Sequence, residues 1–445
     1  MRTQLTAWLI RWGVSPAMFT GAVWSIGGNV AGAAASLVTQ MILARALEAT
    51  RYGVYSYILA WVNVAVVFGK LEFDTAAVRF IGTYVGQRND GLLLGFLRYG
   101  RRVVGGTATG IAIVAGVVAW LLRDRMPPGA EQAVLAACVL VPLSALLGFN
   151  GSALQGFQRI PQAQLPQLLL RPVLFGVGIV LVTSGLRLEL GAGGAVAINA
   201  LATAVALGVS LLLLGRARPG VAAAPAFDTA RWMSAVRGFM LIATAQLVLS
   251  QQADILVVGT FLSARDAGLY SAASQLASLV AFGATAVIFV VLPVISELHA
   301  QGRRQDLQRL VVRTVQGCAA VSVPITILLF AAGHIVLRWY GAAFDDAYAV
   351  MIVLSTAQLF QATIGIVSGF LLTMTGHEWE ASRVIVGTAV LNLALTLVLT
   401  PWFGAVGAAA ATAVAGLIKL SLLRWYARRY LGVDVVLYLR AAPGT

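Results

Sequence analysis

Charged residues are scarce in this sequence. Asp, Glu, Lys and Arg together make up 11% of the 445 residues, whereas a soluble domain carries about 25%. Hydrophobic residues make up 59%, and they fall in runs of roughly 20, the length that a helix needs to cross a bilayer. This composition excludes a soluble domain with a water-facing surface. It predicts an all-α integral membrane protein, because helices are the open-chain fold that satisfies the backbone in lipid.

Cysteine and histidine are also rare. The two cysteines, Cys138 and Cys318, lie in apolar stretches and show neither a disulfide pattern nor metal-ligand spacing. The three histidines are scattered, and the sequence holds no Ser/His/Asp or Cys/His cluster. We therefore expect a protein that is not an enzyme and that holds no metal or cofactor. A Gly-x-x-x-x-Gly-Lys-Ser/Thr loop is missing as well, so any transport is expected to use a H+ or Na+ gradient or the substrate's own gradient.

The net charge of +14 does not indicate a nucleic-acid partner. The basic residues lie in short loops between apolar runs, without the basic groove and stacking aromatic residues that bind single strands. When the loops are assigned alternately to two faces, most Lys and Arg residues fall on the side of the amino terminus. This bias predicts that both termini are cytoplasmic. Residues 1–13 place their apolar side chains on one helical face, which suits a short interfacial helix.

About twelve transmembrane helices are expected. Turn residues such as Arg51-Tyr52-Gly53 and Thr400-Pro401 separate them. The expected spans are 17–43, 52–73, 101–122, 132–155, 166–184, 192–215, 238–261, 268–293, 312–331, 348–375, 383–400 and 404–423.

The sequence repeats itself between its two halves. A Gly-x-Tyr-Ser motif occurs at 53–56 and again at 268–271, and the surrounding positions match without a gap. The matched pairs are Leu47 and Leu262, Gly53 and Gly268, Tyr55 and Tyr270, Ser56 and Ser271, Arg88 and Arg303, Leu92 and Leu307, and Arg98 and Arg313. We interpret this pattern as two parallel six-helix bundles, at 1–215 and 237–445, joined by a cytoplasmic linker at 216–236.

Four segments resemble the bacterial polysaccharide and O-antigen export flippases. These segments are Ile-Leu-Ala-Arg-Ala-Leu at 42–47, Thr-Ala-Ala-Val-Arg-Phe-Ile at 75–81, Gln-Ala-Asp-Ile-Leu-Val-Val-Gly at 252–259 and Ala-Gly-Leu-Tyr-Ser-Ala-Ala at 267–273. That family shares a superfamily with the MATE exporters and the lipid II flippases. The resemblance implies a flippase that moves undecaprenyl-pyrophosphate-linked oligosaccharide across the bacterial inner membrane by alternating access. It also implies membrane lipids, a polysaccharide polymerase and other proteins of the pathway as partners.

Three other functions are compatible with parts of the pattern. A MATE-like exporter of organic cations, coupled to H+ or Na+, would share the architecture, and so would a lipid II flippase, although the latter usually has two more spans. A membrane-embedded polymerase or ligase of the same pathway is the third. Such enzymes carry a large external loop, whereas the longest external loop expected here is about 332–347.

Asp254 is the sharpest candidate for ion coupling. It is an acid well inside an expected span, with Gln251 and Gln252 beside it, and a carboxylate in the membrane is costly and usually functional. The alternative is a structural partner for an arginine or for polar helix packing.

The candidate substrate ligands are cationic and amide side chains in or near the spans. Arginine forks match phosphate oxygens, and amides can bind sugar hydroxyls. For the arginines, an interfacial position with the head group in water is the alternative, and for the amides it is helix packing. The candidates are Arg45, Arg79, Arg171, Asn29, Gln358 and Gln361, with Asn150, Gln155 and Asn392 as further amides.

Overall fold

The structure is a computed structural model that describes residues 16–121, 130–217 and 224–436. These residues form helices and connecting segments without a β-strand. Eight of the helices are long and apolar enough to cross a membrane, and two of those eight each cover two expected spans. The prediction of an all-α membrane protein with about twelve spans is confirmed. The interfacial helix expected at 1–13 lies outside the described residues.

The chain divides into two compact units. Unit 1 comprises residues 1–47 and 61–243, and unit 2 comprises residues 48–60 and 244–445. The sequence pattern predicts one bundle over 1–215 and a second that begins at 237. In the structure, residues 48–60 lie with unit 2, and the expected linker ends in a helix that begins at Thr229 and packs mostly with unit 1.

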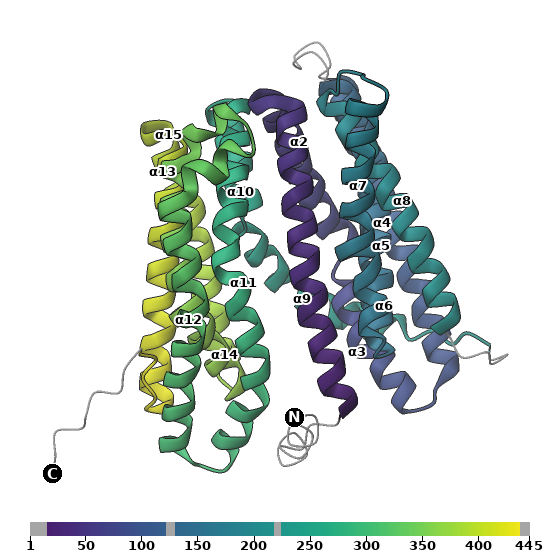
Figure 1. Cartoon of the computed structure of the whole chain (residues 1–445). Helices are drawn as coiled ribbons and strands as arrows, with labels where there is room; N and C mark the ends of the chain where they lie inside the picture. The colour runs from purple at the N-terminus through teal and green to yellow at the C-terminus, as the bar shows by residue number, and fades with distance from the viewer. Residues whose placement is uncertain (1–15, 122–129, 218–223, 437–445) are drawn as a thin grey trace. The chain divides into compact units, whose positions relative to one another are not determined.

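Unit 1 is a bundle of helices that lie side by side (Figure 1). Two of its helices are shared with unit 2, α2 and α9. Its elements are α2 (Pro16–Lys70), α3 (Phe73–Gly86), α4 (Asp90–Leu121), α5 (Ala130–Gly156), α6 (Ile160–Gln164), the π-helix η2 (Leu165–Leu170), α7 (Arg171–Val180), the π-helix η3 (Leu181–Gly185), α8 (Ala192–Ala217) and α9 (Thr229–Val248).

Unit 2 is a second bundle, in which α11, α12, α13 and α15 run alongside one another (Figure 1). Its elements are α10 (Gln251–Phe261), α11 (Ala264–Ala300), α12 (Arg304–Arg338), the 3-10 helix η4 (Ala342–Ala347), α13 (Tyr348–Phe360), the π-helix η5 (Gln361–Gly365), α14 (Ile366–Met374) and α15 (Glu378–Leu431).

Two helix boundaries fall at left-handed residues and not at the expected turns. In α2, the break between the first two spans is at Glu48, with φ 60° and ψ 170°. Arg51-Tyr52-Gly53 is helical, so the turn expected there was wrong. In α15, the break is at Gly404, with φ 63° and ψ −151°. Glycine adopts this region without a steric penalty. The break is therefore at Gly404, three residues after the proline of the expected turn.

The span expected at 238–261 is also interrupted. The helix α9 ends at Val248 and α10 begins at Gln251, with Ser250 in an extended conformation between them, φ −83° and ψ 156°. The Ser250 hydroxyl donates to the carbonyl of Leu247 at 2.6 Å, so the side chain satisfies one of the carbonyls that the break releases. The break places the start of a new helix inside an apolar span.

The repeated glycines allow a close helix contact inside unit 2. A Cβ atom on Gly268 would lie 2.7 Å from the carbonyl oxygen of Ala49 and 2.9 Å from the nitrogen of Gly53. A Cβ atom on Gly53 would overlap the carbonyl oxygen of Ala264. Gly53 and Gly268 are matched by the repeat, and so are Ala49 and Ala264. The contact is therefore reciprocal, with small residues letting two backbones approach as they do in other membrane helices.

Candidate functional site

Asp254 lies in the first turn of α10 and is 2% exposed. Of the side chains that the structure describes, it is the only buried one with a formal charge. The break at Ser250 explains the position, because a carboxylate at the start of a helix faces unpaired backbone N–H groups and the positive end of the helix dipole. The helix start created by the break therefore stabilises a carboxylate inside an apolar span, where a charge would otherwise be costly.

Two hydroxyl groups converge on one oxygen of this carboxylate. Tyr270 Oη, from α11, and Thr412 Oγ1, from α15, each donate to Asp254 Oδ2 at 2.8 Å. Asn392 Oδ1 lies 3.3 Å from Thr412 Oγ1. Three helices of unit 2 thus bring together a carboxylate, a phenol, an alcohol and an amide, which we call the Asp254 cluster.

The second carboxylate oxygen has no partner among the described residues. Asp254 Oδ1 is buried without a hydrogen bond, and so is the hydroxyl of Thr396, one helical turn beyond Asn392 on α15. Buried polar atoms are nearly always paired, and the exceptions call for an explanation. A proton on Asp254 Oδ1, or a monovalent cation next to it, would supply the missing partner of the carboxylate, since hard cations prefer oxygen ligands.

The two neighbouring glutamines do not join the Asp254 cluster. Gln251 Nε2 donates to the carbonyl of Ser274 at 3.0 Å and so ties α10 to α11. Gln252 is half-buried and makes no side-chain hydrogen bond with the described residues. Their role as ion ligands stays a prediction. Tyr270 was not predicted from the sequence as a site residue, although the repeated Gly-x-Tyr-Ser motif contains it, and no sequence signal marks Thr412.

Unit 1 has a different arrangement at the matched positions. The repeat partner of Asp254 is Thr39, whose hydroxyl donates to the carbonyl of Pro172 at 3.0 Å. Next to Pro172, the half-buried Arg171 donates from Nε and Nη2 to Asn199 Oδ1 at 3.2 and 3.1 Å. Thr203 Oγ1 donates to the carbonyl of Asn199 at 2.7 Å. In this unit the position matched to the carboxylate is a neutral threonine, and the nearby helix α7 begins with a hydrogen-bonded arginine.

The remaining candidates are spread over several helices. Arg45 and Arg79 are exposed, whereas Asn29 is half-buried. Gln358 is half-buried in α13, and Gln361 begins the π-helix η5 with a buried Oε1 atom that has no partner in the described structure. Within each unit, the described structure does not gather these side chains into one cluster. Their roles as substrate ligands stay predictions.

Comparisons with known proteins identify the family. The family model described as "Polysaccharide biosynthesis protein" matches residues 42–349, more than half of the chain. A probable low-salt glycan biosynthesis flippase of Haloferax volcanii is 24% identical over 72% of this chain, and the match spans 66% of that relative, just under two thirds of its length.

Solved structures show the same fold. An inward-facing multidrug resistance MATE family transporter of the MOP superfamily superposes with a TM-score of 0.73 at 12% identity, over 92% of this chain and 98% of that chain. The lipid II flippase MurJ, in an inward closed conformation, superposes with a TM-score of 0.69 at 13% identity, over 91% and 87%. The resemblance drawn from the sequence is confirmed: this chain belongs to the polysaccharide biosynthesis protein family, on a fold shared with MATE transporters and a lipid II flippase.

Proposed function

We propose that this protein is a flippase that moves a lipid-linked oligosaccharide across the bacterial inner membrane for surface polysaccharide assembly. The observation that carries the proposal is the family match over 42–349. The similarity to a probable glycan biosynthesis flippase supports it. The fold similarity alone does not select the cargo, because it covers a drug transporter and a lipid flippase equally.

The proposed cargo is an oligosaccharide on undecaprenyl pyrophosphate. Its isoprenoid tail can remain in the bilayer, but each unpaired hydroxyl moved into hydrocarbon costs roughly 2–7 kcal/mol and the pyrophosphate far more. A protein that shields the head group with arginine forks and amides lowers this barrier without making or breaking a bond. We also propose that the protein is a transporter and not an enzyme, and that both of its termini are in the cytoplasm. A polysaccharide polymerase is among the proposed partners.

The Asp254 cluster supports ion coupling. Its single carboxylate balances one positive charge, and the remaining oxygens around it belong to neutral side chains. A H+ or a Na+ therefore suits the cluster better than a divalent cation, which needs more anionic ligands. Because an ion bound here neutralises a buried charge, its arrival and departure change the free energy of the surrounding helices.

The test is transport in proteoliposomes. Purified protein is reconstituted, and a fluorescent lipid-linked oligosaccharide is followed across the bilayer with and without a H+ or Na+ gradient. We expect flipping that accelerates with one of the two gradients, and Asp254→Asn should remove the acceleration. The matched control is Asp346→Asn, because Asp346 is exposed and paired with Arg265.

Two results would contradict the proposal. Export of an organic cation such as ethidium, with no movement of the lipid-linked oligosaccharide, would identify a drug exporter on the same fold. Gradient dependence that survives in Asp254→Asn would leave the flippase in place but remove the coupling site.

A further inference from the structure

A rigid aromatic cluster joins α3, α4 and α9 within unit 1. Trp232 is fully buried, and its Nε1 donates to Tyr84 Oη at 2.8 Å. Its ring meets Phe96 edge-on at 5.2 Å, and Tyr84 stacks on Phe80 at 6.0 Å. The segment before α9 is fixed as well, because the N–H of Ala226 donates to the carbonyl of Gly91 at 2.8 Å. The start of α9 is therefore held firmly against the bundle.

Two guanidinium groups lie over one ring of this cluster. The Cζ atoms of Arg79, from α3, and Arg231, from α9, are 5.6 and 6.0 Å from the centroid of Phe80. Phe80 is 3% exposed, whereas both arginines are exposed. The ring itself is buried, and each exposed guanidinium lies within 6.0 Å of its centroid, where the electrons of the ring attract a cation.

Neither arginine has an anionic partner among the described residues. No ion pair or side-chain hydrogen bond involves either guanidinium in the part of the chain that the structure describes. Of the nearby acids, Asp74 pairs with Lys70, and Asp228 Oδ1 accepts the backbone N–H of Arg231 at 3.4 Å. Phe80 therefore has two positive charges near one ring, and an anion that contacts both would relieve their repulsion.

We propose that Arg79 and Arg231 together bind the diphosphate of a lipid carrier's head group. Each planar guanidinium presents parallel N–H donors that match phosphate oxygens, and two of them match two linked phosphates better than one. The inference rests on the proposed function, which supplies a ligand with a diphosphate. It adds Arg231 and Phe80 to Arg79, which is one of the three arginines that the sequence predicts as phosphate ligands.

The position suits the loading of cargo. The basic residues of the loops predict that α3 ends and α9 begins on the cytoplasmic side, where the lipid-linked oligosaccharide is expected to enter. The arginine pair is also specific to the first half of the repeat. The position of the second half that matches Arg79 is Val294, which has no charge. Unit 2 therefore lacks an equivalent of this pair at the matched position.

The experiment measures binding of a long-chain polyprenyl diphosphate, without sugar, to the full chain in phosphatidylcholine nanodiscs. Arg79→Gln and Arg231→Gln should each weaken binding by about tenfold, the loss expected for one charge-assisted contact. Arg79→Lys and Arg231→Lys should weaken it less, because the charge remains and the fork is lost. Arg98→Gln, which removes an exposed arginine of α4, is the control and should bind as the wild type does. A thermal melt of each variant checks that it folds.

Competition identifies the ligand class. Polyprenyl monophosphate should displace the diphosphate probe about tenfold less well than unlabelled diphosphate, because it offers one phosphate to two arginines. Equal displacement by phosphatidylglycerol would overturn the inference and mark a general site for anionic lipids. Equal weakening in Arg98→Gln would overturn it too. Transport of the lipid-linked oligosaccharide by the wild type is measured separately. Transport without any effect of the two arginines on diphosphate binding would overturn this inference and leave the proposed function in place.

Discussion

Single residues decide how the Asp254 cluster can handle an ion. Thr412 donates its one hydroxyl proton to Asp254 Oδ2, and its oxygen lies beside Asn392. Thr412→Val keeps the shape and removes the oxygen, so we expect the half-saturating ion concentration for transport to rise by about tenfold. The measurement is the ion dependence of flipping in proteoliposomes.

Two further substitutions make that prediction specific. Thr412→Ser keeps the hydroxyl and should restore the ion dependence of the wild type. Thr388→Val removes a buried hydroxyl from the same helix, where it bonds only backbone carbonyls of its own turn, and it should leave the ion dependence unchanged. An unaltered half-saturation in Thr412→Val would separate this hydroxyl from coupling.

Gly53 tests the helix contact that the repeat builds. A Cβ atom there would overlap the backbone carbonyl of Ala264, and a backbone atom cannot swing aside as a side chain does. Gly53→Ala should therefore lower the free energy of unfolding by about 1–3 kcal/mol, seen as a lower melting temperature in detergent. Gly110→Ala is the matched control, because it lies inside α4 with nothing within 4 Å of the added carbon. It should melt no lower than the wild type, since alanine favours a helix.

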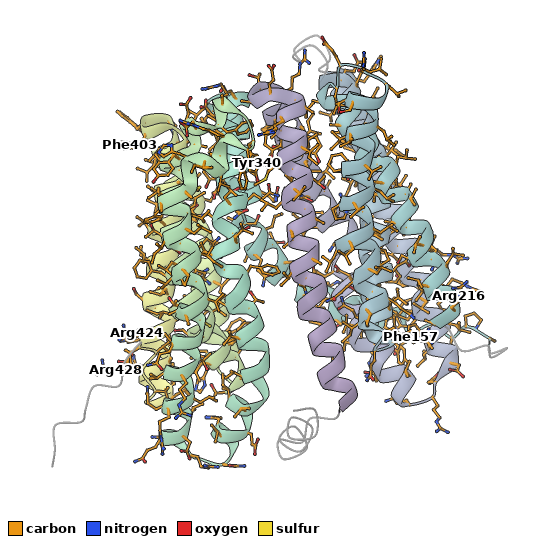
Figure 2. The ribbon with its side chains drawn as sticks, in the orientation of Figure 1. Phe157, Arg216, Tyr340, Phe403, Arg424 and Arg428 are labelled. Carbon is orange, nitrogen blue, oxygen red and sulfur yellow. The ribbon has the colours of Figure 1, made fainter. Side chains whose placement is uncertain are left out.

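At the scale of elements, the segment that follows α15 closes one end of unit 2. Val433 and Val435 are buried in its core, and Gln308 from α12 both donates to the carbonyl and accepts from the N–H of Asp434 at 2.7 Å. Figure 2 shows Arg424 and Arg428 low on α15 and Phe403 high on it, next to the break at Gly404. The Arg424 Nε donates to Asp434 Oδ1 at 2.8 Å.

This segment predicts a stability that depends on pH. The hydrogen bond and charge of Arg424 hold the pKa of Asp434 below its usual value of 3.8. A carboxylate with a depressed folded pKa stabilises the fold above its unfolded pKa, and the effect disappears as the pH falls through the folded pKa. Asp434→Asn should therefore melt below the wild type at pH 7, by about 1 kcal/mol or less because the pair is partly exposed. The difference should shrink below pH 3.8.

The control for that prediction is Asp346→Asn. The Arg265–Asp346 pair has comparable geometry, with N···O at 2.7 Å, but both side chains are more exposed. Its removal should change the melting temperature little at any pH. A wild type and Asp434→Asn that melt together at pH 7 would mean that Gln308 and the two valines hold the segment without the ion pair.

The sequence predicts the spans, because long apolar runs mark them. It does not predict the helix breaks, because these depend on the backbone geometry of single residues. The long runs located most spans, and Asp254 stood out as an acid within one of them. The left-handed break at Glu48 has no turn residue to mark it, and the break before α10 depends on a single serine. Thr412 lies far from Asp254 in the sequence, and threonine is common in such helices. Its contact with the carboxylate is a property of packing that no local pattern encodes.

At the scale of the whole molecule, the two halves share a scaffold and differ in charge. Unit 2 has a carboxylate with one unpaired oxygen at position 254, whereas the matched Thr39 in unit 1 is neutral and contacts the carbonyl of Pro172, the neighbour of the hydrogen-bonded Arg171. A second positive ion near that guanidinium would be repelled. We therefore expect one coupling ion per transport cycle, bound in unit 2, and a dependence of flipping on ion concentration with a Hill coefficient of about one, since cooperative binding needs at least two sites.

The counterpart experiment places the charge in unit 1. Thr39→Asp adds an acid at the matched position, and we expect Arg171, the neighbour of the Pro172 that contacts residue 39, to pair with it, so the Hill coefficient should stay at about one. The combination Thr39→Asp with Arg171→Gln leaves that acid without the cation and should allow a second ion to bind. Its ion dependence should become steeper than that of either single variant. A wild type that already shows a steep dependence would mean that unit 1 binds an ion despite Arg171, and the charge difference between the halves would then not set the stoichiometry.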